Sequence, residues 1–216
     1  MNDLSPDKAA ALARIGEFLR DPARKLFVLH GLAGTGKTWL LTKYLAAALP
    51  RVYMCAPTNK AAKNLMDDGE FSVSTVHSMI LYPVETKKKD ARGRDVIEWG
   101  DKPFYGDLVL LDECSMIDTE LRDKLLGKCN KLIAFGDPGQ LPPVNGTPGF
   151  DLADFALTTN FRQQEGSGIV NQALAVRDGQ PYRTHGPEFE CLTRGQEEVL
   201  LRSDIALCYR NDNRQV

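Results

Sequence analysis

The segment from His30 to Leu41 contains a glycine-rich run made of residue types that bind phosphate. Residues Gly31, Leu32, Ala33, Gly34, Thr35, Gly36, Lys37 and Thr38 fit the spacing G-x-x-x-x-G-K-S/T. Glycines at these positions let backbone N–H groups close around phosphate oxygens, and a helix N-terminus adds favourable partial charge. Lys37 would neutralise the outer phosphates, and Thr38 would ligate Mg²⁺. We therefore predict that residues 31–38 bind a nucleoside triphosphate.

Two adjacent carboxylates, Asp112 and Glu113, follow the apolar run 107–111. Ligands of open parallel sheets bind at the carboxyl ends of the strands, so this pair should face the phosphates. We predict that Asp112 holds Mg²⁺ and that Glu113 orients and deprotonates the attacking water. An acidic pair after a strand is also typical of a solvated turn; the upstream glycine loop favours the catalytic interpretation.

The elements that position these residues follow from the hydrophobic pattern. Short apolar runs predict strands over 25–30, 51–56, 107–112 and 131–135. Helical spacing and start signals predict helices over 5–19, 39–49, 58–66 and 119–128, the first with Ser5 as its cap and Pro6 in its first turn. This alternation predicts an α/β fold in which helices cover both faces of a parallel sheet.

The composition suits a soluble globular protein, with 43% hydrophobic and 26% charged residues in 216. The five cysteines form no C-x-x-C pair, which is typical of a reduced intracellular protein. No apolar run approaches the ~20 residues of a membrane span. We expect a cytoplasmic location in a bacterial or phage-infected cell, or another intracellular one. Because the net charge is −2, contacts with nucleic acid must come from a local groove.

Four further segments distinguish among the classes of protein that contain a glycine-rich phosphate-binding loop. They are A-P-T-N-K-A-A over 56–62, S-T-V-H-S over 74–78, F-G-D-P-G-Q-L-P-P-V over 135–144 and L-T-T-N-F-R-Q over 157–163. Together with D-E-C-S-M over 112–116, they resemble the motifs of superfamily-one helicases. The most similar branch moves 5′ to 3′ and includes RecD-like and Dda-like enzymes. The motifs occur in the family's order along residues 1–216. A guanine-reading N-K-x-D segment is not apparent, so ATP is the expected nucleotide.

The resemblance implies ATP-driven translocation on single-stranded DNA with duplex unwinding, and ATP and Mg²⁺ as cofactors. It implies single-stranded DNA and a duplex junction as partners, with replication or repair proteins beside them, and a monomer with no membrane contact. Gln140 resembles the γ-phosphate sensor and Arg162 an arginine finger from the second motor domain, acting with Lys37 and Glu113. The residues matching DNA-contacting motifs are Pro57, Thr58, Asn59, Lys60, Thr75, His77 and Ser78.

Four of these residues have a plainer alternative role. A lone histidine such as His77 is more often a hydrogen-bonded surface or core residue. Asn59 and Lys60 could be simple first-turn residues of a helix, and Arg162 could be a structural ion-pair partner.

The resemblance also predicts a domain organisation. Residues 1–153 would form a RecA-like motor domain, with a small hairpin subdomain inserted at about 81–106. Lys87, Lys88 and Lys89 in that insert would face nucleic acid; the alternative is a solvated loop. Residues 154–216 would be the incomplete start of a second RecA-like domain, because the family's last motifs have no counterpart before Val216. We therefore expect the chain to bind nucleotide without unwinding DNA.

One position departs from the family. Relatives place an adenine-reading glutamine where Lys8 stands, after Leu4-Ser5-Pro6-Asp7. Lysine has donors and no acceptor, so we expect loose base selectivity. Two other functions stay open: an ATPase subunit of a repair nuclease complex, and a nucleotide-dependent DNA-binding module without unwinding activity. The intact pair Asp112 and Glu113 argues against the second.

Overall fold

The computed structural model describes residues 4–49, 51–67, 71–89, 93, 95–159, 171–172, 175–176 and 179–181. The chain divides into two compact units, Met1–Arg162 and Gln163–Val216. Most of residues 154–216, expected to begin a second motor domain, lie outside the described residues, so that assignment stays a prediction. No helix in the described part has both the length and the apolar character needed to cross a membrane.

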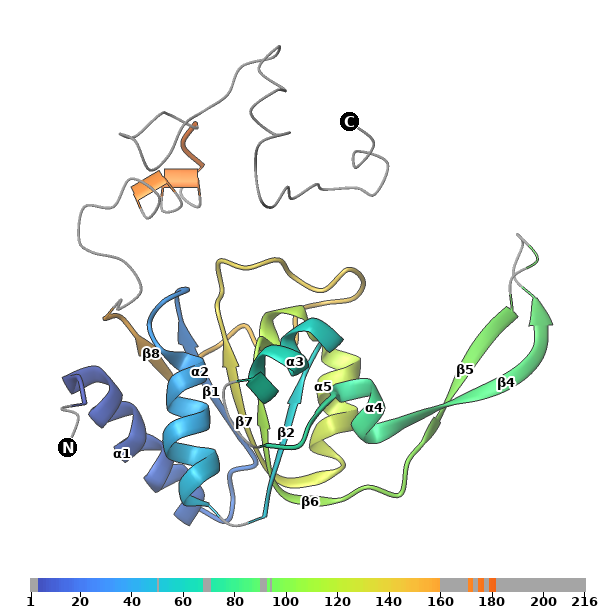
Figure 1. Cartoon of the computed structure of the whole chain (residues 1–216), viewed down its shortest axis with the longest axis horizontal. Coiled ribbons are helices and arrows are strands. Elements are labelled where there is room, and N and C mark those ends of the chain that lie inside the picture. The colour runs from blue at the N-terminus through green and yellow to red at the C-terminus, as the bar shows by residue number, and fades with distance from the viewer. Residues whose placement is uncertain are drawn as a thin grey trace. The chain divides into compact units, whose positions relative to one another are not determined.

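The first unit is built on a six-stranded parallel sheet with the order β3-β2-β6-β7-β1-β8 (Figure 1). This confirms the predicted α/β fold. The strands of this sheet are β1 (Leu26–Gly31), β2 (Val52–Ala56), β3 (Val73–Thr75), β6 (Gly106–Leu111), β7 (Cys129–Gly136) and β8 (Phe155–Leu157). The helices are α1 (Pro6–Arg20), α2 (Lys37–Trp39), η1 (Leu40–Ala46), α3 (Asn59–Asp67), α4 (Val76–Ile80), η2 (Cys114–Met116) and α5 (Thr119–Leu126).

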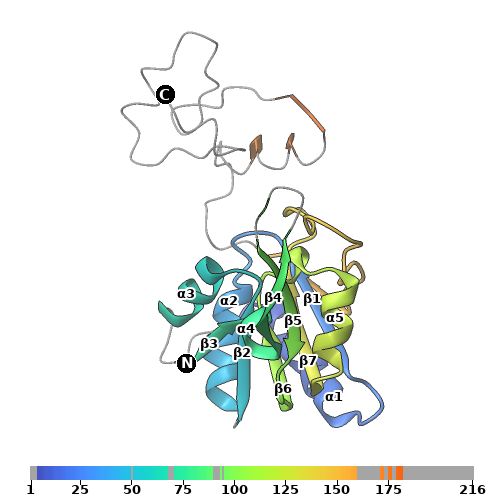
Figure 2. The same cartoon turned by 90° about the vertical axis from the view of Figure 1, so that its right-hand side faces the viewer.

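Helices cover both faces of the sheet because its strands alternate their buried side chains. On β1, Phe27 and Leu29 join the cluster that packs against α1, η1 and α3, whereas Val28 joins the cluster that packs against α4 and α5. Figure 2 shows the same layers from the side. Both faces of the sheet are therefore apolar. Polar side chains lie where the strands end.

The helix after the glycine loop begins at Lys37 as a short α-helix and continues as a π-helical stretch over Leu40–Ala46. Leu40, Leu41 and Leu45 on this stretch are buried. The expected helix over 39–49 is therefore present, and it starts two residues earlier than predicted.

An antiparallel hairpin projects from the body of the first unit (Figure 1). Its strands are β4 (Leu81–Lys89) and β5 (Asp95–Asp101), paired from Leu81 with Asp101 to Lys89 with Asp95. The small hairpin expected at about 81–106 is confirmed. The register shifts between Glu85 and Lys89.

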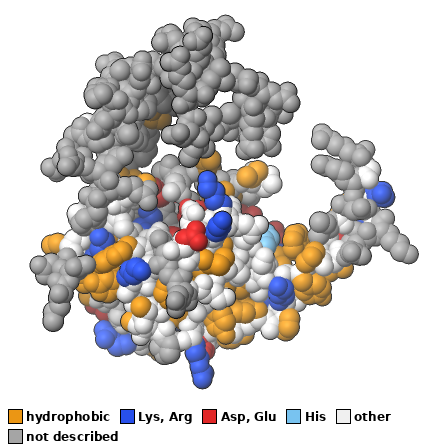
Figure 3. Space-filling model, viewed as in Figure 1, with side chains coloured by type: hydrophobic (Ala, Val, Ile, Leu, Met, Phe, Trp, Pro, Cys, Tyr) orange, Lys and Arg blue, Asp and Glu red, His pale blue; other side chains and the backbone are white. Residues whose placement is uncertain are grey.

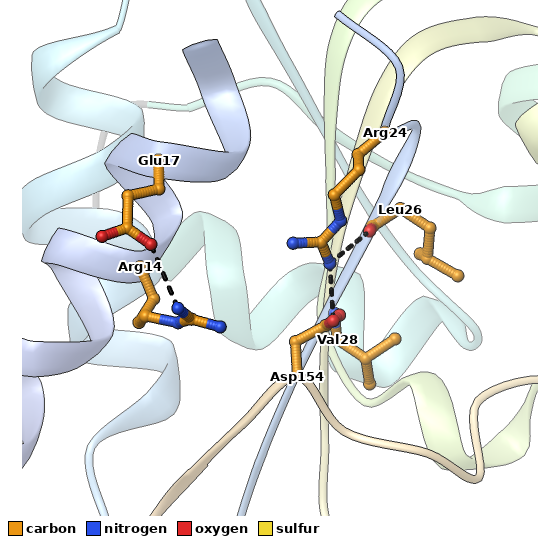
Figure 4. A network of polar contacts seen from close by, with 6 residues as sticks. All are labelled: Arg14, Glu17, Arg24, Leu26, Val28 and Asp154. Atoms are coloured by element: carbon orange, nitrogen blue, oxygen red, sulfur yellow. Dashed lines mark hydrogen bonds and ion pairs between the residues drawn. The ribbon is translucent and has the colours of Figure 1, made fainter. Parts of the chain in front are cut away.

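The edge strand β8 is attached to β1 by a polar network shown in Figure 4. Asp154, just before β8, accepts a hydrogen bond from the Val28 N–H at 2.8 Å and pairs with Arg24 at 2.5 Å. The Asp154 N–H donates to the Val28 carbonyl at 2.8 Å. These bonds hold β8 beside β1, the strand that precedes the glycine loop.

Candidate nucleotide and nucleic-acid site

The glycine loop connects the end of β1 to the start of α2, and its own contacts explain the glycines. Gly36 has a φ of +82°, a conformation that side chains disfavour. At Gly31 an added Cβ would lie 2.5 Å from the Thr35 hydroxyl oxygen, which is too close. Thr35 is buried, and its hydroxyl donates to the Leu32 carbonyl at 2.9 Å. The loop is thus held by internal bonds.

Lys37 is the first residue of the helix that follows the loop. Its ammonium donates to the carbonyl oxygens of Gly31 at 2.6 Å and of Leu32 at 3.0 Å. The positive charge therefore lies across the loop, beside the partly positive helix N-terminus. This position suits a counter-charge for bound phosphates.

Thr38 and Asp112 come together from elements far apart in the sequence. The Thr38 hydroxyl donates to Asp112 Oδ2 at 3.0 Å, and Asp112 is buried. The other carboxylate oxygen, Oδ1, accepts from the Glu113 N–H at 3.0 Å. Mg²⁺ prefers oxygen ligands and is commonly bound by one or two carboxylates together with phosphate oxygens. The hydroxyl and the carboxylate fit that ion.

Glu113 stands at the carboxyl end of β6 in a left-handed backbone conformation, with φ of +53°. A non-glycine residue in this region is uncommon and often marks a functional position. Burial raises the pKa of Glu113, and the neighbouring Asp112 charge raises it further, whereas Lys37 and Lys60 lower it. A raised carboxyl pKa suits a general base, because proton transfer is most efficient when the pKa approaches the working pH.

Gln140 follows β7, which lies between β1 and β6 in the sheet. Its backbone N–H donates to the Asp137 carbonyl at 3.0 Å, and Asp137 is buried. Gln140 and Asp137 line a small cavity of about 110 Å³ together with His30 and Ser115. The structure thus places Gln140 at the same sheet edge as the acidic pair. Arg162 lies outside the described residues, so its role stays a prediction.

The predicted DNA-contacting hydroxyls also cap helices, which sequence reasoning did not anticipate. The Thr58 hydroxyl oxygen accepts from the Ala61 N–H at 3.2 Å at the start of α3. The Thr75 oxygen accepts from the Ser78 N–H at 3.1 Å, and the Thr75 hydroxyl donates to Ser78 Oγ at 2.8 Å. These bonds give both threonines a structural role, because they stabilise the first turns of α3 and α4.

A groove of about 360 Å³ brings several predicted DNA residues together. Pro57, Thr58 and His77 line it beside Trp99 of β5 and Val144 of the loop after β7. The His77 and Trp99 rings are 5.7 Å apart, and Trp99 is 52% exposed. Figure 3 shows a histidine beside hydrophobic side chains where the hairpin leaves the body.

Trp99 is a candidate site residue that the sequence reasoning missed. The available signal was an aromatic side chain at the end of a short strand beside charged neighbours. Exposed aromatic rings are the usual stacking surfaces for bases of single-stranded nucleic acid. Asn59 and Lys60 are exposed at the first turn of α3, next to the groove residue Thr58.

One lysine of the hairpin stretch 87–89 already pairs with a carboxylate. Lys88 Nζ pairs with Glu98 Oε1 across the two strands at 2.7 Å, which raises the pKa of Lys88. Lys89 is exposed, and the side chain of Lys87 lies outside the described residues. The contact of these lysines with nucleic acid stays a prediction.

Comparison with known proteins identifies the family. A family model described as AAA domain matches residues 8–188. The chain belongs to this family. The AAA domain chain is 31% identical over 188 residues to the ATP-dependent RecD2 DNA helicase of Deinococcus radiodurans, covering 82% of this chain and 24% of that protein. It is 28% identical over 187 residues to the RecD subunit of the RecBCD enzyme of Mycolicibacterium smegmatis, covering 71% and 33%.

Solved structures share the fold of this AAA domain chain. Bacteroides Pif1 bound to single-stranded DNA matches with a TM-score of 0.59 at 22% identity, covering 83% of this chain and 47% of that one. Pif1 helicase from Candida albicans matches with a TM-score of 0.57 at 23% identity, covering 84% and 46%. The family match and the RecD relatives confirm the resemblance to superfamily-one helicases of the 5′-to-3′ branch. The chain spans a third or less of these curated relatives and under half of these solved chains.

Proposed function

We propose that this chain is the ATP-hydrolysing motor portion of a DNA helicase that moves 5′ to 3′ on single-stranded DNA and unwinds duplex. The observation that carries the proposal is the Thr38–Asp112 hydrogen bond of 3.0 Å at the glycine loop. It joins a hydroxyl and a carboxylate suited to Mg²⁺ directly beside Glu113, which is suited to act on water. A loop used only to bind phosphate needs neither carboxylate.

The residues divide the chemistry among them. Backbone N–H groups of residues 31–38 and the Lys37 ammonium would bind the phosphates, and Thr38 and Asp112 would hold Mg²⁺. When bound, the ion would supply positive charge that offsets the charge of the phosphates. Glu113 orients a water molecule toward the γ-phosphorus and accepts its proton. Gln140, at the same sheet edge, would sense the γ-phosphate, and Arg162 would stabilise transition-state charge.

We propose DNA as the substrate because the groove, whose lining includes Met116 three residues after Glu113, combines polar and aromatic side chains. Pro57, Thr58, His77 and Trp99 line it, and base stacking on aromatic rings suits single strands of any sequence. The Deinococcus relative is named a DNA helicase, and the Bacteroides fold relative was solved with single-stranded DNA. Lys60 belongs to the turn beside this groove and also acts on the charge of Glu113, so DNA contact and hydrolysis can be coupled there.

Two assays test the proposal. ATP hydrolysis with Mg²⁺ should rise when single-stranded DNA is added, since contact at the groove acts on the turn that carries Lys60. In a strand-displacement assay, the full natural protein should unwind a duplex with a 5′ single-stranded tail and leave a duplex with a 3′ tail intact. A rate of ATP hydrolysis that does not change when DNA is added would contradict the proposed function. Unwinding of the duplex with a 3′ tail would also contradict it.

A second function is favoured by the RecD relative, which is a subunit of the RecBCD enzyme. The chain would then act as the ATPase subunit of a repair nuclease complex. Purification of the natural protein from its own cells distinguishes the two. Recovery in a complex with ATP-dependent nuclease activity supports this function, whereas a free chain that unwinds DNA alone rules it out.

A further inference from the structure

A small polar cavity lies between η2, the turn after Glu113, and the loop that follows β7. Its volume is about 110 Å³, and its lining includes His30, Ser115, Asp137 and Gln140. The two segments touch beside it, since a Cβ added to Gly136 would lie 2.6 Å from Cys114 Sγ and 3.6 Å from the Ser115 backbone nitrogen. Close packing therefore joins η2 to the end of β7 at the edge of the cavity.

The Ser115 hydroxyl is buried at this cavity without a hydrogen-bond partner. Among the residues that the structure describes, no other buried side-chain nitrogen or oxygen is left in this state. A buried polar group that makes no hydrogen bond costs free energy, and such groups in native proteins often have a catalytic role or bind water. Serine has three staggered side-chain positions, so the hydroxyl can turn into the cavity. The polar groups that line the cavity are therefore its candidate partners.

Asp137 is the acceptor in this cavity that best fits the hydroxyl. It is buried, and its Oδ1 accepts a hydrogen bond from the Gly139 N–H at 2.9 Å. A carboxylate has two oxygens with about four lone-pair sites, so Oδ2 can accept a further bond. The Asp137 carbonyl also accepts from the Gln140 N–H at 3.0 Å. Asp137 thus holds the turn that carries Gln140 through both its side chain and its backbone.

We propose that Ser115 is a positioning residue for ATP hydrolysis. Its hydroxyl turns into the cavity and donates a hydrogen bond to the Asp137 carboxylate, directly or through one water. This bond fixes the turn of Gln140, the proposed γ-phosphate sensor, relative to Glu113 at the start of η2. The inference rests on the proposed function, because it concerns the same reaction.

The test compares steady-state ATP hydrolysis, with single-stranded DNA present, in variants of the full natural protein. Ser115→Ala should lower kcat by roughly three- to tenfold, the size of effect expected from one hydrogen bond. The KM for ATP and the Mg²⁺ requirement should not change, because the hydroxyl acts through Gln140 and not on the nucleotide. Ser115→Thr keeps a hydroxyl and should restore most of kcat. Ser72→Ala, at an exposed serine before β3, is the matched control, and circular dichroism checks the fold of each variant.

A double-mutant cycle shows whether Ser115 acts through Gln140. Gln140→Ala should lower kcat by itself, and adding Ser115→Ala should then cause little further loss, because both changes remove one shared effect. A merely structural role would instead lower kcat by the same factor in both backgrounds. Equal factors overturn the inference. A wild-type kcat in Ser115→Ala also overturns it, as does a loss in Ser115→Thr as large as that in Ser115→Ala.

The outcomes separate this inference from the proposed function. If wild type hydrolyses ATP and Ser115→Ala matches it, only the role of Ser115 falls. If the cycle shows coupling between Ser115 and Gln140 but wild type displaces no strand, only the proposed unwinding activity falls. If wild type hydrolyses no ATP with DNA present, both fall.

Discussion

The carboxylate of Asp7 accepts a hydrogen bond from the backbone N–H of Thr159 at 2.9 Å. The same oxygen accepts from the Thr158 N–H at 3.2 Å, and the Ser5 hydroxyl donates to the other oxygen at 2.5 Å. Ser5 occupies the cap position of α1 as predicted, but its hydroxyl bonds to Asp7. Asp7 thus links the start of α1 to the chain that leaves β8 toward Arg162.

The first prediction concerns stability at low pH. Burial by itself would raise the pKa of Asp7, but the hydrogen bonds from Ser5, Thr159 and Thr158 lower it to about 2 from the ordinary value of 3.8. The folded-state pKa lies below the unfolded one, so ionised Asp7 stabilises the fold fully above about pH 4. This contribution is lost as the pH falls toward 2.

Replacing Asp7 with Asn should therefore lower the free energy of unfolding by about 1–2 kcal/mol at pH 7, with the value reduced by solvent screening. The difference from wild type should shrink as the pH falls below about 4. Urea unfolding at pH 7 and at pH 2.5 measures it, with Asp67→Asn at the exposed end of α3 as the control. A difference that stays constant with pH would contradict the assignment.

The second prediction separates binding from hydrolysis at the glycine loop. Glu113→Gln should keep ATP affinity and reduce hydrolysis by a factor of about 10² or more, because it removes the base and preserves the side-chain shape. Lys37→Ala should instead weaken ATP binding, since it deletes a phosphate counter-charge. Calorimetric titration and a phosphate-release assay report the two effects. Near-normal ATP turnover in Glu113→Gln would show that Glu113 is not the general base.

The third prediction addresses the Thr38–Asp112 pair. Thr38→Val keeps the shape of the side chain and removes the hydroxyl that donates to Asp112. The variant should need a higher Mg²⁺ concentration for half-maximal ATP hydrolysis, while the fold persists. Circular dichroism checks the fold, and a Mg²⁺ titration of turnover checks the site. An unchanged Mg²⁺ requirement would show that Thr38 is not a ligand.

The fourth prediction concerns the hairpin lysines. Changing Lys87, Lys88 and Lys89 together to Gln should weaken binding to single-stranded DNA. The slope of log affinity against log salt should become less negative by up to about 2, since each phosphate contact on a single strand contributes about 0.7. ATP affinity should not change. Lys43→Gln, on an exposed position of η1, is the control.

The ion pair between Lys88 and Glu98 refines that expectation. Glu98→Gln removes the partner of Lys88 and should strengthen DNA binding at low salt, because the freed ammonium can meet a phosphate. Equal salt slopes in wild type and the triple variant would show that these lysines do not touch DNA.

The fifth prediction tests the groove. Trp99→Ala should weaken binding to single-stranded DNA by about 1–3 kcal/mol, as expected for loss of one stacked base. Trp99→Phe should restore most of the affinity, because a smaller ring can still stack. Fluorescence anisotropy with a labelled oligonucleotide measures both. Full affinity in Trp99→Ala would indicate that this face does not hold bases.

Local patterns in the amino-acid sequence determine much of this protein by themselves. The glycine loop, the acidic pair Asp112–Glu113 and the longer strands and helices were predictable, because each depends on neighbouring residues or on a regular hydrophobic period. The strands β3 and β8 and the helix α4 were not, because each has only three to five residues and so shows no period.

Only the tertiary structure decided which distant residues meet. The sequence showed Lys8 as a departure from a family pattern, and folding buries it against Gly36. Asp7 meets Thr159, and His77 meets Trp99, through contacts between segments that no sequence spacing relates. The physical reason is that strand order and helix packing arise from burying apolar surface across the whole unit. Which polar side chains become neighbours at the sheet edge depends on that arrangement, and not on the residues beside them in the chain.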